Sequence, residues 1–317
     1  MNLRIGSRGS QLALWQANHI ADRLRCHEHT VEIEIIKTTG DRLQEVTFAQ
    51  VGSKGMFTKE IEDALAEGRV DLAVHSLKDL PTELPAGFAL AATPARVDPR
   101  DVFVSVKYAD VSALPGGAKV GTSSQRRRAQ LKELRPDVEA VEFRGNVDTR
   151  LRKLAEGQVD AILLAAAGLD RLEKTEWVRQ RLDPKDFCPA AGQGSLGIET
   201  RLNDAETMAA LAFLDDAATR YAVTAERAAL AALGGGCQVP IGIHCRAASG
   251  QEPGESSWEI FGVVANPETG KTVRAYHSVP GTHCDPAALG RTIAEMLLAS
   301  GAGSLLDGAA LGAGGAA

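Results

Sequence analysis

The sequence predicts an α/β protein with two doubly wound lobes, followed by a smaller α+β domain. Three observations lead to this fold class. Strand-like and helix-like segments alternate over residues 3–160, a short motif occurs twice in the same context, and the pattern changes after about residue 217. Strands that alternate with helices favour mostly parallel sheets covered by helices on both faces.

Each expected lobe contains a strand, a helix and a second strand in the same order. In the first lobe these are residues 3–7, 10–25 and 31–38. We expect the helix over 10–25 to bury one side, because apolar residues recur there at helical spacing. That side consists of Leu12, Trp15, His19, Ile20 and Leu24. In the second lobe, the corresponding segments are residues 118–124, 125–134 and 138–146, followed by a helix over 147–157.

The repeated motif reads LAEGRVD at residues 65–71 and LAEGQVD at 154–160. Each copy follows a charged helical pattern and precedes an apolar run, LAVHS in the first and AILLAAAG in the second. Gly68 and Gly157 occupy the position where a helix commonly ends with a left-handed residue. The shared context favours an internal duplication.

The domain boundaries follow from changes in composition. Pro94 and Pro99 flank a charged segment, which indicates a crossover, and the Gly-rich segment PAAGQGSLGIE is expected to return the chain to the first lobe. Beyond residue 217, a helix precedes two alternating strands joined by a turn at 266–270, and a last helix follows. The predicted domains are residues 1–94 with 195–212, residues 100–189, and residues 217–317, which end in a frayed tail rich in Gly and Ala.

Composition excludes several classes of protein. The 317 residues carry a formal net charge of −6, and aromatic residues make up 4%, which disfavours binding to nucleic acid. Five scattered cysteines without a Cys-x-x-Cys pair argue against disulfides and structural zinc, so no metal is expected. No secretory signal and no apolar run of membrane-spanning length is visible, which predicts a cytoplasmic protein.

Three strand-to-helix turns carry arginine and hydroxyl side chains. A helix N-terminus offers unpaired N–H groups to anions, and arginine matches a carboxylate or phosphate with its planar fork. In a parallel sheet these turns lie at the carboxyl ends of the strands, where ligands bind. Helix capping by Ser and Asn, and a solvated face for RRR, are the structural alternatives. The turns supply Arg8 and Ser10, then Thr122, Ser123, Ser124, Arg126, Arg127 and Arg128, and lastly Arg144, Asn146 and Arg150.

Other candidate residues lie outside these turns. Lys78 and Asp79 follow an apolar strand, and Asp79 is either a carboxylate that stabilises a developing cation or the partner of Lys78 in an ion pair. Residues 37–57 form a long expected loop, mobile over residues 42–56, that carries Lys54. Cys237 stands between glycines and Pro240, a setting that favours an accessible thiol able to form a covalent adduct.

The motifs, taken in order, closely resemble those of the porphobilinogen deaminase (hydroxymethylbilane synthase) family over residues 3 to about 300. They include RGSQLALWQ, AVHSLKDLP, VGTSSQRRR, FRGNVDTRL, PAAGQGSLGIE and GGGCQVPIG. The resemblance implies three domains, the first two like the lobes of periplasmic binding proteins. It also implies a transferase that joins four porphobilinogen molecules into a linear tetrapyrrole and releases ammonia at each addition. Gln50 and Gln125 depart from residues common in the family.

The resemblance assigns roles residue by residue. Cys237 matches the cysteine that holds the dipyrromethane cofactor through a thioether, and Asp79 matches the catalytic aspartate. The resemblance further implies a monomer that passes its product to uroporphyrinogen-III synthase. Residues at matching positions for binding the acetate and propionate groups are Arg8, Ser10, Lys54, Lys78, Thr122, Ser123, Ser124, Arg126, Arg127, Arg144, Arg150 and Arg171.

Three other functions compete with this one. A two-lobed protein that binds anions without catalysis accounts for the repeat and the arginines, but it gives Asp79 and Cys237 no role. A nucleic-acid binder would form complexes that weaken with salt. A Schiff-base enzyme using Lys78 would show an absorbance band from an internal aldimine.

Overall fold

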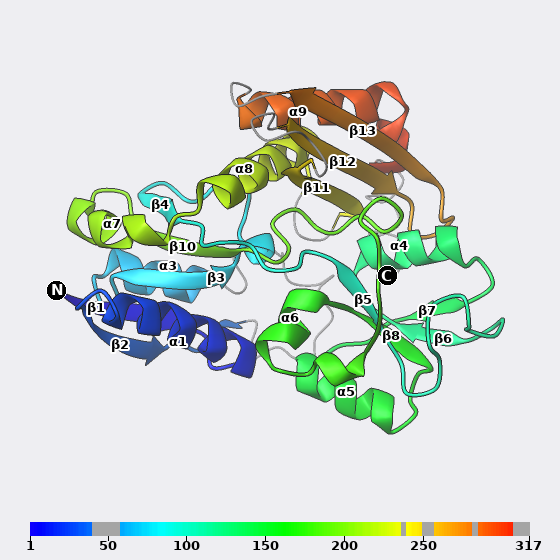
Figure 1. The fold of residues 1–317 in the computed structure, drawn as a ribbon, viewed down its shortest axis with the longest axis horizontal. Coiled ribbons are helices and arrows are strands. Elements are labelled where there is room, and N and C mark those ends of the chain that lie inside the picture. Colours follow the sequence, from blue (N-terminus) through cyan, green and yellow to red (C-terminus); the bar gives the residue numbers. More distant parts are fainter. Residues whose placement is uncertain (40–57, 236–238, 249–256, 281–284, 307–317) are drawn as a thin grey trace. The chain divides into compact units, whose positions relative to one another are not determined.

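The computed structural model describes residues 1–39, 58–235, 239–248, 257–280 and 285–306. The chain divides into two compact units, and the elements of both are labelled in Figure 1. Unit 1 contains residues 1–97 and 194–220, and unit 2 contains residues 98–193 and 221–317. Among the described residues, no helix is long and apolar enough to cross a membrane. The three-domain division remains a prediction.

Unit 1 is built on a five-stranded sheet with the order β2-β1-β3-β10-β4. Strands β1, β2 and β3 run parallel, and β10 runs antiparallel to both β3 and β4. The strands are β1 (Asn2–Ser7), β2 (Thr30–Ile35), β3 (Leu72–Ser76), β4 (Phe88–Ala92) and β10 (Leu196–Arg201).

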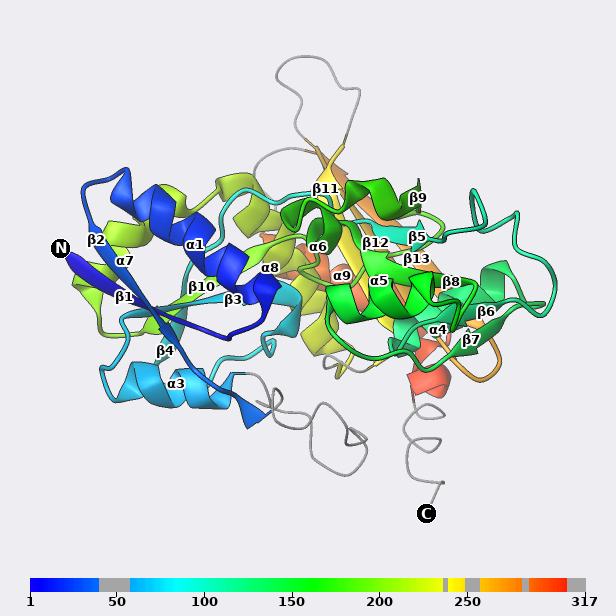
Figure 2. The ribbon, with the colours of Figure 1, turned by 90° about the horizontal axis from the view of Figure 1, so that it is seen from below.

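Helices cover both faces of this sheet, as expected for a doubly wound fold. The helix α1 (Gln11–Arg25) packs on one face and α3 (Lys59–Ala66) on the other (Figure 2). The face of α1 also receives α7 (Ala205–Leu211) and the 3-10 helix η4 (Ala212–Leu214). Another 3-10 helix, η2 (Leu77–Asp79), directly follows β3.

The buried side of α1 differs from the expected one. Ala17, Ile20, Ala21 and Leu24 are buried, whereas His19 is exposed and stacks on the half-buried Trp15. Small alanine side chains let the helix lie close to the sheet, so the bulky Trp15 is displaced to the edge of the buried face. The sequence pattern predicted the helix correctly but placed Trp15 and His19 on its buried side, where the structure has Ala17 and Ala21.

The sheet of unit 2 repeats the strand order and strand directions of unit 1. Its order is β7-β6-β8-β5-β9, with β6 parallel to β7 and β8, and with β5 antiparallel to β8 and β9. Position by position this matches β2-β1-β3-β10-β4, which supports the duplication inferred from the repeated motif. The strands are β5 (Asp101–Val104), β6 (Lys119–Gly121), β7 (Glu139–Val141), β8 (Ala161–Ala165) and β9 (Val178–Arg181).

The two copies of the motif end equivalent helices. Gly68 follows α3 with φ of +69°, and Gly157 follows α5 (Val147–Ala155) with φ of +78°. Both lie in the left-handed region that glycine adopts at little cost, as expected. The remaining helices of this sheet are α4 (Gln125–Leu134), α6 (Ala166–Arg171) and the 3-10 helix η3 (Thr175–Trp177).

The rest of unit 2 is the α+β module, a three-stranded antiparallel sheet covered on one face by two helices (Figure 1). Its hairpin turns at 266–270, as predicted. Ala129 of α4 packs in a small core with Phe261 and Val263, on β12. The elements are α8 (Ala217–Ala232), which begins in unit 1, β11 (Ile241–Ala247), β12 (Ser257–Ala265), β13 (Thr272–Pro280) and α9 (Pro286–Ala299).

Gly290 allows α8 and α9 to approach closely. A Cβ atom at Gly290 would lie 2.1 Å from the carbonyl oxygen of Ala225, on α8. We therefore expect Gly290→Ala to lower the free energy of unfolding by about 1–3 kcal/mol, because the helices must separate. Urea denaturation measures the change. Gly303→Ala is the matched control, since nothing lies within 4 Å of its added Cβ, and an equal loss there would contradict the packing explanation.

Candidate active site

Asp79 and Lys78 lie in the turn that follows the central strand β3. Asp79 is exposed and Lys78 is half-buried, whereas Leu77 and Leu80 point inward with 1% and 3% exposure. The Leu77 N–H donates to the carbonyl oxygen of Ser195 (3.0 Å), which extends the pairing of β3 with β10 into the turn. The apolar residues thus fix the turn and leave its two charged side chains at the surface of unit 1.

The turn after β1 lies at the same edge of the sheet. Strands β1 and β3 are parallel neighbours, so their carboxyl ends, and the residues that follow them, share one edge. Ser10 caps α1, with its Oγ accepting from the N–H of Ala13 (3.3 Å), and Arg8 is half-buried. The structure therefore brings Arg8, Ser10, Lys78 and Asp79 to one edge of unit 1.

In unit 2, hydroxyl side chains organise the turn between β6 and α4. Ser124 caps α4 by accepting from the N–H of Arg127 (3.4 Å). The buried Thr122 Oγ1 accepts from the N–H of Ser124 (3.2 Å). Ser123 Oγ donates to the carbonyl oxygen of Phe143 (2.8 Å), in the turn after β7. The capping interpretation of Ser124 is thus correct, and the hydroxyls join two adjacent turns.

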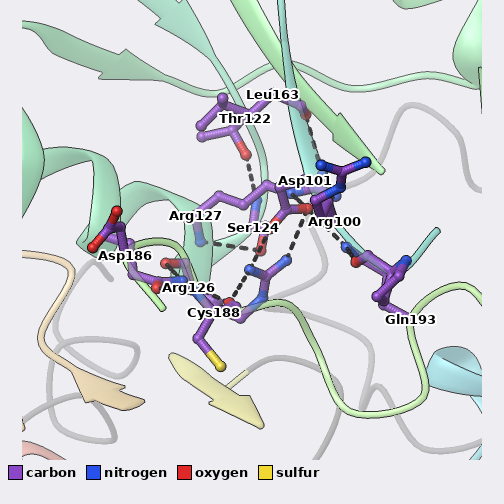
Figure 3. Close-up of polar contacts among 12 residues, drawn as sticks. Arg100, Asp101, Thr122, Ser124, Arg126, Arg127, Leu163, Asp186, Cys188 and Gln193 are labelled. Atoms are coloured by element: carbon purple, nitrogen blue, oxygen red, sulfur yellow. Dashed lines mark hydrogen bonds and ion pairs between the residues drawn. The ribbon is translucent and has the colours of Figure 1, made fainter. Parts of the chain in front are cut away.

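Arg126 and Arg127 are buried, with 4% and 6% exposure, and both pair with the buried carboxylate of Asp101 (Figure 3). Arg126 Nη1 lies 2.6 Å from one carboxylate oxygen, and Arg127 Nη2 lies 2.8 Å from the other. Gln193 Nε2 donates to Asp101 Oδ1 (3.0 Å). Arg126 also donates to the carbonyl oxygen of Cys188 (2.7 Å), and Arg127 to that of Leu163 (3.1 Å).

The charges of this cluster shift one another's protonation. Burial by itself raises the pKa of Asp101, but the adjacent guanidiniums of Arg126 and Arg127 outweigh it and hold that pKa well below its usual range. Burial lowers the pKa of Arg127, and Asp101 opposes that effect. Two guanidiniums against one carboxylate leave a net positive charge in this cluster.

Further arginines lie near the same edge of the unit 2 sheet. The half-buried Arg150 donates from Nε to the carbonyl oxygen of Gly145 (2.7 Å), and burial lowers its pKa to about 10. Among the residues that the structure describes, no carboxylate oxygen lies within 4.0 Å of the Arg150 guanidinium. Arg144 Nε donates to Glu142 Oε1 (2.5 Å). Arg171 is buried after β8, and burial lowers its pKa to about 10.

Sequence reasoning missed Asp101 and Gln193, the residues that pair with the arginines of α4. Asp101 was read as part of a charged crossover, although it begins the apolar strand DVFV, where a carboxylate needs a buried partner. A carboxylate at the start of an apolar strand was therefore the sequence signal from which a buried partner of Asp101 could have been predicted. Lys54 and Cys237 lie outside the described residues. No group of three His, Cys, Asp or Glu side chains suited to a metal was found within the described part of the chain.

The duplicated, doubly wound fold, with arginines and hydroxyls at the carboxyl edges of its sheets, defines a class of α/β proteins built from two similar lobes. Comparison with family models makes the class specific. Residues 3–209 match the model of the "porphobilinogen deaminase, dipyromethane cofactor binding domain", and residues 220–299 match that of the "porphobilinogen deaminase, C-terminal domain". The chain belongs to the porphobilinogen deaminase family, which functions in tetrapyrrole biosynthesis.

Curated relatives agree over nearly the whole length. The chain is 49% identical to the porphobilinogen deaminase of Trichlorobacter lovleyi, over 96% of each chain. It is also 49% identical to that of Chromobacterium violaceum, over 95% of this chain and 96% of the relative. Among solved structures, a putative methionine-binding lipoprotein from Bacillus subtilis is similar at 12% identity, with a TM-score of 0.42, over 67% of this chain and 89% of the other.

Proposed function

We propose that this protein is a hydroxymethylbilane synthase, a transferase that joins four porphobilinogen molecules head to tail and releases ammonia at each addition. The growing chain is built on a dipyrromethane primer held by Cys237 through a thioether. Family membership supports the activity and the cofactor. The observation in this chain that carries the proposal is the excess of buried arginine charge in unit 2.

Arg150 is the clearest part of the arginine charge at the carboxyl edge of the unit 2 sheet. Its half-buried guanidinium contacts no carboxylate among the described residues, which costs free energy, and an acidic ligand would supply the missing charge. Porphobilinogen and a dipyrromethane carry an acetate and a propionate on each pyrrole, so this donor chemistry fits both. Each charge-assisted hydrogen bond contributes roughly 1.5–3 kcal/mol. We assign Arg144, Arg150 and Arg171 to these carboxylates. Arg127 shares the role given to Arg126 below, because its guanidinium already contacts Asp101 and the carbonyl oxygen of Leu163.

Arg126 has a different assignment within the proposal. Its guanidinium already contacts Asp101 and the carbonyl oxygen of Cys188, which occupies much of its fork. We propose that Arg126 contributes positive charge to the site and keeps Asp101 ionised. The remaining anion contacts are assigned to Arg8, Ser10, Lys54, Lys78, Thr122, Ser123 and Ser124.

Asp79 is assigned as the catalytic residue. When ammonia leaves porphobilinogen, positive charge develops on the substrate, and an adjacent carboxylate stabilises that charge. The same carboxylate accepts hydrogen bonds from pyrrole N–H groups and orients the ring. Its exposed position at the end of η2 leaves the carboxylate accessible to a substrate. When bound, the primer would supply the nucleophilic pyrrole carbon that receives the first unit, and each later unit would be added to the pyrrole at the free end of the growing chain.

The alternative is a non-catalytic anion-binding protein of the same fold. The family match favours the enzyme, because such a binding protein has no use for a primer-carrying cysteine. We further propose a cytoplasmic monomer that transfers its product transiently to uroporphyrinogen-III synthase.

Intact-mass spectrometry of the purified protein tests the proposal. We expect an added mass equal to one dipyrromethane, located by peptide mapping on the peptide that contains Cys237. Cys237→Ser should lose both the added mass and the activity. If the wild-type thiol is bare, incubation with porphobilinogen distinguishes an apo-enzyme, which gains mass at Cys237, from a binding protein, which does not.

A further inference from the structure

Three ionisable side chains are buried inside unit 1, away from the residues assigned above. His75 lies on β3, Glu199 on β10 and Glu62 on α3, with 7%, 0% and 9% exposure. His75 Nε2 lies 2.9 Å from Glu199 Oε2. All three belong to the face of the sheet that α3 covers, because Ala73, two residues before His75, packs in the core under α3.

The hydrogen-bonded His75 and Glu199 are costly to keep in a core. Buried polar side chains recover their desolvation cost only when all their hydrogen-bonding atoms are satisfied, and apolar residues often serve as well. Within the described residues, Glu199 Oε1 is buried and has no hydrogen-bond partner. Burial raises the pKa of Glu62, and the nearby Glu199 raises it further. Packing alone therefore gives no reason for these side chains.

Their location provides a reason. In the antiparallel register, His75 pairs with Gly197, and Ser76 pairs with Leu196. The side-chain bond from His75 to Glu199 crosses the two strands diagonally, two residues before η2 begins. The turn that carries Asp79 packs against Gly197 through Leu77 and Leu80. A Cβ atom at Gly197 would lie 2.9 Å from the Leu77 side chain and 3.1 Å from that of Leu80.

We propose that His75 and Glu199 are positioning residues for Asp79. Their bond fixes the alignment of β3 against β10, and β10 in turn supports Leu77 and Leu80, which hold the turn that presents Asp79. This inference rests on the proposed function, because it takes Asp79 as the catalytic residue. Misplacement of a reacting group by about 1 Å can cost on the order of 100-fold in rate, so a small realignment suffices.

Glu199→Met tests the inference in the full-length, cofactor-loaded enzyme. Methionine keeps the length of the side chain and leaves no unpaired carboxylate. We expect kcat to fall roughly 10- to 100-fold, with KM for porphobilinogen changed less than about threefold. The dipyrromethane mass on Cys237 should remain. Glu199→Gln should recover most of the rate, because its amide oxygen accepts from His75 Nε2–H.

The controls separate positioning from stability. Ile198 is the neighbouring residue on β10, is fully buried and points to the opposite face, so Ile198→Ala destabilises the same strand without touching the pair. Its kcat should stay within about twofold of wild type. An equal loss of kcat in Ile198→Ala, or an unchanged kcat in Glu199→Met, would overturn the inference. His75→Leu breaks the same bond from the other side and decides the question if Glu199→Met does not fold.

Asp79→Asn, measured in parallel, distinguishes a failure of this inference from a failure of the proposed function. If the wild-type enzyme forms no linear tetrapyrrole from porphobilinogen, the proposed function is wrong. If the wild type is active and Asp79→Asn keeps full activity, Asp79 is not the catalytic residue, and the positioning role of Glu199 falls with it. If Asp79→Asn loses activity while Glu199→Met keeps it, the proposed function stands and His75 and Glu199 have no positioning role.

Discussion

Replacing Asp101 by alanine is expected to lower the free energy of unfolding by about 3–5 kcal/mol, which is the usual cost of removing one partner from a buried ion pair. Asp101 is fully buried and accepts from Arg126, Arg127 and Gln193. Without it, two guanidiniums would remain in the interior without a carboxylate. Urea denaturation of the purified variant measures the loss.

Asp137→Ala is the matched control for this prediction. Asp137 also pairs with an arginine, since Arg135 Nη2 lies 2.7 Å from its Oδ2, but its side chain is 48% exposed. Solvent screens that pair, so the loss should be much smaller than that of Asp101→Ala. Similar losses in the two variants would show that burial does not set the strength of the Asp101 cluster.

The same cluster predicts a dependence of stability on pH. The pKa of Asp101 is lowered in the folded protein, so its contribution to stability is present above the unfolded pKa, about 3.9 for aspartate. That contribution declines as pH falls below about 4, because Asp101 then takes up a proton in the unfolded chain while it stays ionised in the folded protein. It is lost once pH falls through the lower pKa of the folded state. Asp101→Asn should therefore show a flatter decline of stability in acid than the wild type. If stability declined equally steeply in the wild type and in Asp101→Asn, the lowered pKa of Asp101 would be contradicted.

Asp79→Asn is expected to lower kcat by about 10²- to 10³-fold, the usual effect of removing one group that stabilises transition-state charge. The amide keeps the shape of the side chain but lacks the negative charge that opposes the developing cation. Steady-state assays of product formation measure the effect, with cofactor occupancy checked by intact mass.

Stability separates this effect from unfolding. Asp79 is exposed, so the free energy of unfolding should change by no more than about 0.5 kcal/mol. Asp22→Asn, at another exposed carboxylate of unit 1, should leave both stability and kcat unchanged. A rate for Asp79→Asn within threefold of wild type would rule out the catalytic role.

Much of the fold could be predicted because local patterns and tertiary demands agree. Gly68 and Gly157 end equivalent helices with left-handed backbones, and the motif around them marks two sheets with the same strand order and directions. The buried side of α1 was misjudged at Trp15 and His19, because hydrophobicity alone does not favour alanine over tryptophan at a tightly packed helix–sheet contact.

The site could be predicted only in part, because the sequence alone does not show which residues a charged side chain contacts in the folded protein. The turn after β6 identified Arg126 and Arg127, but their pairing with Asp101 joins residues 25 and 26 positions apart. The bond between His75 and Glu199 spans 124 positions. A carboxylate inside an apolar strand was the visible sign in both cases, and identifying its partner required the sheet register.

The place of β10 in the sheet has a consequence for biosynthesis. Strand β10 lies between β3 and β4, yet roughly 100 residues separate it from β4 along the chain. During translation the sheet of unit 1 therefore remains incomplete after β4 has left the ribosome, because the edges of β3 and β4 that pair with β10 still have no partner strand. At about 5–20 residues per second, the wait lasts on the order of 5–20 s. The sheet of unit 2 uses a contiguous stretch of chain and can close first, so the nascent protein completes its second lobe before its first.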